Sequence, residues 1–351
     1  MTHGGDVWKG DAPSDWLDFS ANIRPEGVPE WVRRAVLEGL ENVCYYPDPQ
    51  MRRSRAALAQ YLNLDAEYVL PTAGGISAIA MAARLPAREM CAFAPCFCEY
   101  AQMARLHGKP MEEIALLGAP HALLRPTEAL AERDIAGRAL WLCNPLNPVG
   151  VAFSRPEIEA LLERVEAKRG WLIVDEAFIE FSPQNSVRDL IPVHERLLVT
   201  GSMTKALGIP GVRLGYLCAQ PQLLNRLEQG QLTWELNAFA EAVLCALPQN
   251  AQSLRRDAEI NEVRREGLRR GLEALGSFVY PSGANFLLAD LRCSAASVAE
   301  RLRGAGILVR ECMDFSGIND GRHLRLAVKD EASNRRLLYE LKGAMTCAEN
   351  L

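Results

Sequence analysis

Hydrophobic residues recur along this chain in two patterns, short continuous runs and stripes with helical spacing. The short runs predict buried strands and fall at residues 90–94, 139–143, 173–175, 197–200 and 212–218. Segments between them have helical spacing, for example 155–169, whose start is marked by Ser154 and Pro156. Strands that alternate with helices favour a mostly parallel sheet with helices on both faces. We therefore predict an α/β fold for the middle of the chain.

The two ends of the chain are organised differently. Residues 27–43 are predicted to form an amphipathic helix, 52–62 a second helix, and 221–275 a largely helical, charged region. After Pro281 the pattern predicts strands at 284–291, 307–312 and 323–328 and helices at 295–303 and 332–345. This order predicts a smaller α+β unit at the C-terminal end.

Composition narrows the class of protein. The 351 residues could fill two domains, and 49% hydrophobic with 24% charged residues is typical of a soluble globular protein. The net charge of −5, from 39 basic and 44 acidic residues, disfavours nucleic-acid binding. No apolar run approaches the ~20 residues that span a bilayer, and the N-terminus lacks the parts of a signal peptide. We expect a cytoplasmic protein without nucleic-acid or membrane partners.

The ten cysteines do not indicate a metal site. Many lie within apolar segments, as at Cys91, Cys143, Cys218 and Cys245. The sequence has no CxxC pair and no Cys/His spacing suited to zinc. We therefore expect reduced thiols and predict no metal ligands.

The segment 202–213 contains a lysine in a turn rich in small and hydroxyl residues. Lys205 lies three residues after Ser202 and eight before Arg213. This spacing suits a lysine that forms an imine with an aldehyde cofactor whose phosphate is bound by the hydroxyl and the guanidinium. A solvated basic turn between two strands is the alternative, and would be the expectation if this segment stood alone.

Two carboxylates follow the apolar run at 171–174. Ligands of open α/β sheets bind beyond the carboxyl ends of the strands. Asp175 follows the run directly and could pair with a pyridinium nitrogen, whereas we expect Glu176 to face a loop or solvent. A helix cap or turn residue is the alternative for Asp175.

Two further turns carry candidate ligands. Asn147 lies in the Asn/Pro/Gly turn 144–150 and could donate a hydrogen bond to an anionic ring oxygen; a rigid turn is the alternative. Gly74 and Gly75 precede the helical segment 78–85, and amides at a helix N-terminus bind anions. Alone, the second signal is weak.

Taken together and in this order, the four motifs resemble the fold type I family of pyridoxal-phosphate enzymes, which includes the aspartate aminotransferases. The resemblance implies pyridoxal 5'-phosphate as cofactor, a large cofactor-binding domain at 44–235, and a small domain formed by 1–43 with 236–351. It also implies a homodimer with shared active sites, in which Tyr46 reaches the cofactor phosphate of the partner subunit.

The resemblance assigns roles to the motif residues. Lys205 is implied to bind the cofactor covalently and to move protons, Asp175 to hold the pyridine nitrogen, and Asn147 to contact the ring hydroxyl oxygen. The phosphate ligands are implied to be Ser202, Arg213 and the amides of Gly75 and Ile76. Phe97 falls where the family stacks an aromatic ring on the cofactor; an ordinary core aromatic is the alternative.

Peripheral residues resemble those of the threonine-phosphate decarboxylases, one branch of this family. His3, Gly4 and Asn22 match substrate contacts there, although a disordered terminus is the alternative for His3. Phe178 stands where aminotransferases usually have a tyrosine. The substrate-binding arginines of that branch are matched by Arg310 and Arg325, and a solvated arginine is the alternative for Arg310.

These features predict decarboxylation of L-threonine O-3-phosphate to (R)-1-amino-2-propanol O-2-phosphate, a step of cobalamin biosynthesis. Serine phosphate is an alternative substrate, because a missing methyl group gives only ~10–200-fold discrimination. Aminotransfer with histidinol phosphate is the second hypothesis. A cofactor-binding regulatory protein without catalysis is the third, and the intact Lys205, Asp175 and Arg213 disfavour it.

Overall fold

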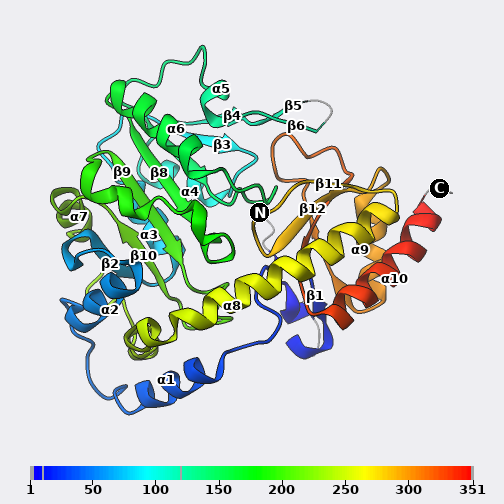
Figure 1. The fold of residues 1–351 in the computed structure, drawn as a ribbon, viewed down its shortest axis with the longest axis horizontal. Helices are drawn as coiled ribbons and strands as arrows, with labels where there is room; N and C mark the ends of the chain where they lie inside the picture. Colours follow the sequence, from blue (N-terminus) through cyan, green and yellow to red (C-terminus); the bar gives the residue numbers. More distant parts are fainter. Residues whose placement is uncertain (1–3, 10–11, 119–120, 349–351) are drawn as a thin grey trace.

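A seven-stranded sheet forms the centre of the computed structural model, which describes residues 4–9, 12–118 and 121–348 (Figure 1). Its strand order is β2-β10-β9-β8-β7-β3-β4. Strand β10 runs antiparallel to the other six, which all run in the same direction. The strands are β2 (Val69–Thr72), β3 (Met90–Ala94), β4 (Met111–Ala115), β7 (Ala139–Cys143), β8 (Trp171–Glu176), β9 (Leu197–Ser202) and β10 (Gly215–Cys218). The predicted α/β sheet is confirmed.

Helices follow the strands of this sheet and cover it. They are α2 (Arg52–Leu62), α3 (Gly75–Ala82), α4 (Glu99–Leu106), α5 (Pro126–Ala129), α6 (Arg155–Ala167) and α7 (Pro221–Glu228). A short hairpin of β5 (Leu117–Gly118) and β6 (Ala122–Leu123) follows the edge strand β4. Single turns of 3-10 helix lie at Val7–Lys9, Pro13–Asp15, Ala66–Tyr68, Ile179–Phe181 and Pro183–Asn185, and a longer one at Arg188–Val193. The largest hydrophobic core lies between this sheet and its helices.

A four-stranded antiparallel sheet forms the second unit, with a hydrophobic core of its own. It contains β11 (Phe278–Val279), β12 (Phe286–Asp290), β14 (Arg310–Glu311) and β15 (His323–Ala327), packed with α9 (Ala295–Gly304) and α10 (Glu331–Ala348). The N-terminal strand β1 (Leu17–Asp18) joins this unit by pairing with β13 (Ile307–Leu308). Figure 1 shows the 37-residue helix α8 (Ala238–Ala274) running from the large sheet to this unit.

The N-terminal helix is shorter than predicted. The pattern predicted 27–43, whereas α1 spans Glu30–Leu40. Val32 and Ala35 are buried, and Gly39 packs so closely on α8 that an added Cβ would lie 3.0 Å from the carbonyl oxygen of Ala238. Leu40 remains half exposed, so the apolar stripe is partly uncovered in the single chain.

Other boundaries differ from the prediction where tertiary contacts set them. The predicted strand at 212–218 begins only at Gly215, and the helical region 221–275 is interrupted between α7 and α8. The run at 307–312 forms two short strands with different partners, β13 against β1 and β14 against β15. Among the described residues, none of the helices combines the length and the apolar character needed to cross a bilayer.

Candidate functional site

A cavity of about 720 Å³ lies at the carboxyl ends of β7 and β8 and is closed by the second unit and the N-terminal segment. It collects almost every residue predicted from the sequence to form the site. Two predicted residues are not among its lining: Tyr46, and His3, which lies outside the described residues. The cavity therefore brings together motifs that lie up to 321 residues apart, from Gly4 to Arg325.

Lys205 faces this cavity from the turn after β9. Its Nζ donates a hydrogen bond to Ser202 Oγ at 3.2 Å and lies 5.5 Å from the centre of the Phe178 ring. Burial lowers the pKa of the Lys205 amine, although the nearby Asp175 carboxylate opposes that shift. A half-buried amine with a lowered pKa is suited to nucleophilic attack on an aldehyde, and the alternative of a solvated turn is wrong.

Asp175 is the penultimate residue of β8, lines the cavity and is 4% exposed. Its Oδ2 accepts a hydrogen bond from the Tyr100 hydroxyl at 2.6 Å, and its Oδ1 accepts one from the Ala177 amide at 3.1 Å. Burial raises the pKa of Asp175, whereas the Tyr100 bond and the Lys205 charge favour the carboxylate. The arrangement holds a buried carboxylate in the cavity wall, where it can pair with a protonated ring nitrogen.

Tyr100 was not predicted from the sequence. It is fully buried in α4 and stacks on Trp141 with ring centroids 4.6 Å apart. The only sequence signal was the nearby aromatic Phe97, whose ring meets Tyr100 edge-on at 5.9 Å and also lines the cavity. Phe97 thus fits both of its predicted alternatives, a core aromatic and a ring that faces a ligand.

Glu176 faces the loop at 186–187 and is shielded from solvent, so the first of its two predicted alternatives is confirmed and the second is wrong. Its side chain is 1% exposed and accepts hydrogen bonds from Ser186 Oγ, at 2.8 and 3.0 Å, and from the Val187 amide at 2.8 Å. Alternation along a strand places neighbours on opposite faces, so Glu176 lies in the protein interior behind Asp175. Burial raises its pKa to about 7.

An anion site is built where α3 begins. Gly74 has a φ of 84°, and a Cβ added there would lie 2.6 Å from a guanidinium nitrogen of Arg213. A Cβ added at Gly75 would lie 3.1 Å from Cβ of Ser202. The guanidinium, the serine and the first amides of α3, including that of Ile76, therefore converge on one space that a side chain would fill.

Thr204 is a second residue that the sequence analysis did not single out. Its hydroxyl lies 2.8 Å from Ser202 Oγ, and both side chains are buried and line the cavity. The hydroxyl-rich composition of the turn was a signal for it. The two hydroxyl groups and Arg213 give this end of the cavity the donors that a phosphate needs.

Two arginines face each other across neighbouring strands at the opposite side. Arg310 and Arg325 are register partners on β14 and β15, and both are less than 10% exposed. Arg325 donates to Asn147 Oδ1 at 2.7 Å and to the carbonyl oxygen of Ser20 at 2.8 Å. Arg310 forms a two-pronged pair with Asp314, at 2.7 Å to each oxygen.

The two arginines make this wall cationic, although the Asp314 carboxylate offsets part of the charge of Arg310. Burial lowers the pKa of Arg325 to about 10, which leaves its guanidinium charged at neutral pH. Arg310 is buried in this wall, so the alternative of a solvated arginine is wrong. Two buried guanidinium groups in one cavity favour a ligand with more than one anionic group.

The N-terminal segment lies against this wall. Gly4 passes so close to Ser20 that an added Cβ would lie 2.1 Å from the carbonyl oxygen of Ser20. The Gly5 amide donates to Ser20 Oγ at 2.8 Å, and Ser20 Oγ donates to Asp18 at 2.6 Å. Asn22 is buried in the lining, and its Oδ1 has no hydrogen-bond partner among the described residues. Gly4 and Asn22 thus lie where the prediction puts them.

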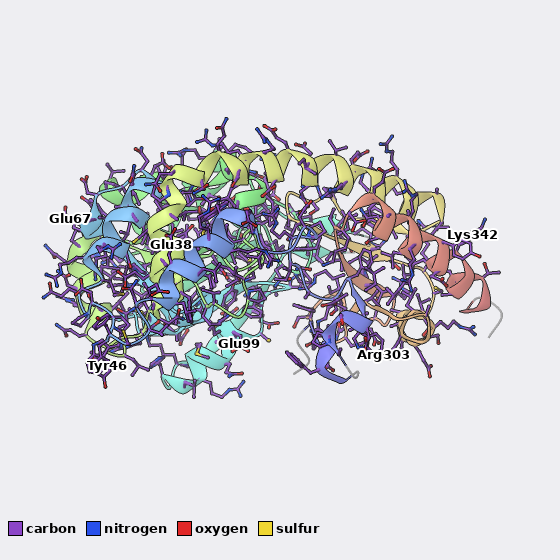
Figure 2. The ribbon with its side chains drawn as sticks, turned by 90° about the horizontal axis from the view of Figure 1, so that it is seen from below. Glu38, Tyr46, Glu67, Glu99, Arg303 and Lys342 are labelled. Atoms are coloured by element: carbon purple, nitrogen blue, oxygen red, sulfur yellow. The ribbon has the colours of Figure 1, made fainter. Side chains whose placement is uncertain are left out.

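Tyr46 lies outside the cavity of its own chain. Its side chain is 79% exposed and stacks on Trp234 with ring centroids 4.4 Å apart. Figure 2 shows it at the periphery of the molecule. A tyrosine that acts in the site of another subunit would have to be exposed in the single chain, so its predicted role stays a prediction.

Pyridoxal 5'-phosphate fits this set of residues. Its phosphate matches the space at the start of α3, which glycine leaves open and a Cβ would close. Its aldehyde and its ring nitrogen require an amine and a carboxylate in one cavity, and Lys205 and Asp175 supply them.

Comparison with known proteins agrees with the geometry. The model of the family described as aminotransferase class I and II matches residues 14–341. A threonine-phosphate decarboxylase from Salmonella typhimurium is 34% identical over 98% of this chain and 96% of its own length. A histidinol-phosphate aminotransferase from Symbiobacterium thermophilum is 31% identical over 94% of this chain and 91% of its own. The crystal structure of the histidinol-phosphate aminotransferase from Clostridium acetobutylicum has a TM-score of 0.87 at 27% identity, covering 95% and 99% of the two chains.

Proposed function

Because the chain belongs to the aminotransferase class I and II family, whose members bind pyridoxal 5'-phosphate, we propose that it decarboxylates L-threonine O-3-phosphate. The product would be (R)-1-amino-2-propanol O-2-phosphate. The observation that carries this proposal is the pair of buried arginines, Arg310 and Arg325, on one wall of the cofactor cavity.

The cofactor roles follow the layout of the cavity. Ser202, Arg213 and the amides of Gly75 and Ile76 would bind the phosphate, with Thr204 beside them. Asp175 would hold the ring nitrogen in its protonated form, and Phe97 would stack on the ring. When bound, the cofactor supplies an electron sink for the bond that breaks at the substrate's α-carbon.

Asn147 is the donor that remains for the ring oxygen. Its Oδ1 accepts from Arg325, so its Nδ2 is the group free to donate toward the cavity. Phe178 lies at the cavity but has no hydroxyl group to donate a second bond there. Asn147 therefore couples the substrate-binding arginine to the cofactor ring.

Two anionic groups on the substrate account for two buried arginines. Threonine phosphate carries a carboxylate and a phosphate, and each can take a bidentate hydrogen bond from a guanidinium fork. We assign Arg325 to the carboxylate and Arg310 to the far side of the substrate, with Gly4, Asn22 and His3 closing over it. Histidinol phosphate has a phosphate but no carboxylate, so it would offer no carboxylate to Arg325.

The reaction breaks the bond between the α-carbon and the carboxylate, and carbon dioxide leaves. The α-carbon must then take up a proton. Lys205 is the proton carrier we propose for this step, because its Nζ lies in the same cavity and its pKa is lowered by burial. The bond that stands perpendicular to the cofactor ring is the one that breaks. The enzyme is a decarboxylase if its binding groups place the bond from the α-carbon to the carboxylate there, and not the bond to the α-hydrogen.

The remaining parts of the proposal concern the whole protein. We propose a cytoplasmic homodimer that supplies the linker precursor of cobalamin's nucleotide loop. Its large domain would comprise 44–235 and its small domain 1–43 with 236–351. Tyr46 would contact the cofactor phosphate of the partner subunit.

The direct test is a substrate comparison with the purified, cofactor-loaded enzyme. Threonine phosphate should release carbon dioxide in proportion to enzyme and time, with no need for a keto acid. Serine phosphate should react more slowly, and unphosphorylated threonine slower still, because threonine lacks the second anionic group that we place at Arg310. Amino transfer from histidinol phosphate to a keto acid, without carbon dioxide release from threonine phosphate, would contradict the proposal.

Arginine variants show whether the cationic wall binds the substrate. Arg325→Lys and Arg310→Lys should each raise KM roughly 10–100-fold, since a hydrogen bond to a charged group contributes about 1.5–3 kcal/mol. Cofactor absorbance should be retained in both. Arg335→Lys, at an exposed arginine of α10 that pairs with Glu331, is the matched control and should behave as the wild type. Loss of cofactor in the Arg325 variant would count against its assignment.

A further inference from the structure

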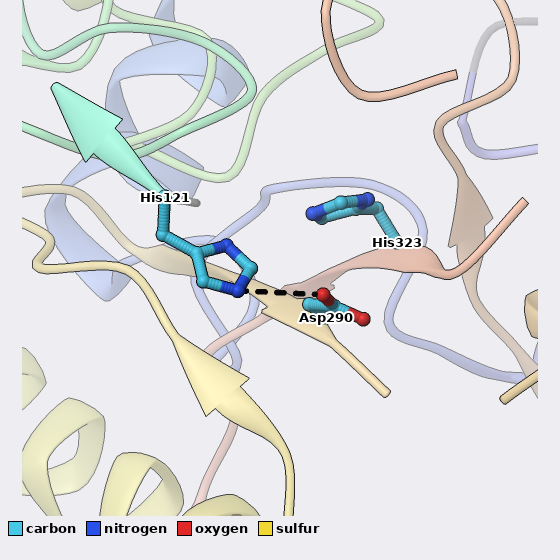
Figure 3. Close-up of side chains that lie close together, drawn as sticks. All are labelled: His121, Asp290 and His323. Atoms are coloured by element: carbon cyan, nitrogen blue, oxygen red, sulfur yellow. Dashed lines mark ion pairs between the residues drawn. The ribbon is translucent and has the colours of Figure 1, made fainter. Parts of the chain in front are cut away.

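A second cluster of ligand-type side chains lies away from the cavity. His121 lies between β5 and β6, Asp290 ends β12 and His323 begins β15 (Figure 3). One ligand atom from each residue lies within 4.8 Å of the other two. Asp290 and His323 are direct register partners, and none of the three lines the cofactor cavity. The cluster is therefore separate from the active site.

The buried histidine has an unused nitrogen. His323 is 4% exposed, and its Nδ1 lies 2.8 Å from Asp320 Oδ1. A carboxylate can only accept, so Nδ1 carries a proton, and the tautomer of the neutral ring that fits this contact has its lone pair on Nε2. That Nε2 is buried and has no hydrogen-bond partner among the described residues. An unpaired buried acceptor is costly, and a metal ion would satisfy it.

The other histidine is oriented in the same way. His121 Nδ1 lies 3.0 Å from the Tyr280 hydroxyl, which leaves its Nε2 facing Asp290 Oδ2 at 3.6 Å. Figure 3 shows the His121 ring turned toward the Asp290 carboxylate, with the His323 ring nearby. Histidines that bind metals almost always have their second nitrogen anchored by a carboxylate, a carbonyl or another polar group. Asp320 and Tyr280 are such anchors.

We propose that His121, Asp290 and His323 bind one divalent transition-metal ion of the zinc class. Two imidazoles and one carboxylate are ligands suited to Zn²⁺ and Co²⁺, and the fourth position would hold water. Tetrahedral coordination at ~2.0–2.1 Å puts ligand atoms about 3.3 Å apart, close to the His121–Asp290 separation. The widest pair of ligand atoms, at most 4.8 Å apart, must close by up to roughly 1.5 Å when the ion binds.

One competing charge must move aside. Arg322 lies 3.3 Å from Asp290 Oδ2, but it also pairs with Asp320 at 2.9 Å and its side chain is about half exposed. It can therefore keep its pair with Asp320 and release Asp290 to a metal ion.

The site would connect the two units of the protein. The β5–β6 hairpin follows the edge strand of the seven-stranded sheet, whereas β12 and β15 belong to the four-stranded sheet. Figure 1 shows the hairpin extending toward the second unit, and the His121 ring stacks on Phe278 of β11 at 4.0 Å. A bound ion would fix the hairpin to the small sheet. This inference does not depend on the proposed reaction.

Metal binding can be measured on the full-length, cofactor-loaded protein, stripped with a chelator and free of any histidine tag. We expect equilibrium dialysis to find one Zn²⁺ per chain, and Co²⁺ to give the visible bands of a four-coordinate ion. His121→Ala and Asp290→Asn should weaken binding at least ~10-fold, because each removes one of three ligands. Cofactor absorbance verifies that both variants are folded.

His194→Ala is the matched control. His194 pairs with Glu166 at 2.9 Å and has the same 24% side-chain exposure as His121, but it belongs to no three-ligand cluster among the residues that the structure describes. It should bind metal as the wild type does. Failure of the wild type to retain an ion, or equal binding in the His121→Ala and His194→Ala variants, would overturn the proposal. Equal binding would assign the ion to another site such as the exposed thiol of Cys44.

Discussion

At the scale of single residues, the function of Asp175 depends on a tyrosine 75 positions earlier in the chain. The Tyr100 hydroxyl donates to Asp175 Oδ2 in a fully buried environment, where it favours the charged carboxylate against burial. A carboxylate that lost this donor would be protonated more easily. It would then no longer hold a proton on a ring nitrogen.

We predict that Tyr100→Phe lowers kcat/KM roughly 10–100-fold, because a hydrogen bond to a charged group contributes about 1.5–3 kcal/mol. Losing the donor raises the pKa of Asp175 further, so the acidic limb of the pH–rate profile should move to higher pH. Tyr61→Phe is the matched control, since Tyr61 donates to Glu180 Oε2 at 2.5 Å outside the cavity. An unchanged pH profile in Tyr100→Phe would contradict the role of this bond.

The buried carboxyl group of Glu176 should make the free energy of unfolding depend on pH. Burial raises the pKa of Glu176 to about 7 in the folded protein, from the ordinary 4.5 of an exposed glutamate, so the folded state binds the proton more tightly. Unfolding then releases a proton between these values, and this contribution to stability is lost as pH rises from about 4.5 to 7. Above pH 7 the buried carboxylate is charged in both states and the loss is complete.

Glu176→Gln removes this titration while keeping the shape and an acceptor for the Val187 amide. The variant should gain stability relative to the wild type as pH rises from 5 to 8, by about 2–3 kcal/mol at most. Urea unfolding of both proteins across this range measures the difference. A difference that falls or stays constant with increasing pH would show that the pKa of Glu176 is not raised.

At the scale of elements, the strands predicted with the correct bounds are those in which every residue is buried. β3 and β7 begin and end at the predicted residues, because both are buried on all sides and therefore read as continuous apolar runs. Helix α2 also begins and ends at the predicted residues, because the apolar stripe along its 11 residues can be recognised from local spacing alone. Lys205, Asp175 and Asn147 could be singled out because Asp175 lies near the carboxyl end of β8 and the other two lie in the turns that follow β9 and β7.

The two strands of the seven-stranded sheet that were not predicted, β2 and β4, lie at its edges. β4 contains Glu112 and Glu113 and is partly exposed, so its pattern is not apolar. β2 contains Pro71, which removes a hydrogen-bond donor and is tolerated in edge strands. Edge strands depend on a neighbour on one side only, and local sequence does not reveal that neighbour. Tyr100 escaped prediction for a related reason, since its partner is distant in sequence.

The start of α3 offers a test at this scale. Gly74→Ala introduces a Cβ 2.6 Å from Arg213 and should displace the guanidinium from the anion site. We expect a large loss of cofactor affinity, measured by titrating the stripped enzyme with pyridoxal 5'-phosphate. The residue also has a φ of 84°, so the substitution costs about 1–3 kcal/mol of backbone strain.

Gly108→Ala separates the backbone strain of the substitution from the contact of the added Cβ with Arg213. Gly108 has a similarly positive φ of 65°, but nothing lies within 4 Å of an added Cβ. This control should show the loss of stability without a loss of cofactor affinity. Equal cofactor affinity in the two variants would mean that Arg213 does not bind the phosphate.

At the scale of the whole molecule, the cavity exists only because distant parts of the chain meet. Its lining includes residues from the N-terminal segment, the seven-stranded sheet and the four-stranded sheet. Periodicity predicted both units, but it could not predict how they pack, because each unit has its own core. The position of Arg310 and Arg325 opposite Lys205 is a product of that packing, and the proposed substrate depends on it.

The last prediction concerns a contact between subunits. Tyr46 is exposed and far from the cavity of its own chain, and we propose that it completes the site of a partner. A hybrid dimer of one Tyr46→Ala chain and one Lys205→Ala chain would then contain one site with both wild-type residues. Random exchange of equal amounts makes half of the dimers hybrid, so about a quarter of all sites should regain full activity.

Activity of the exchanged mixture distinguishes the two arrangements. If Tyr46 acts in the partner's site, the mixture should exceed the average of the two parent proteins. If Tyr46 acts in its own chain, every intact lysine in the hybrid still lacks its tyrosine, and the mixture should equal that average. Absorbance of covalently bound cofactor provides a second measurement, because Lys205→Ala abolishes it in its own chain whichever arrangement holds. An average value, obtained with hybrids verified by two affinity labels, would exclude the shared site while leaving the assignment of Lys205 intact.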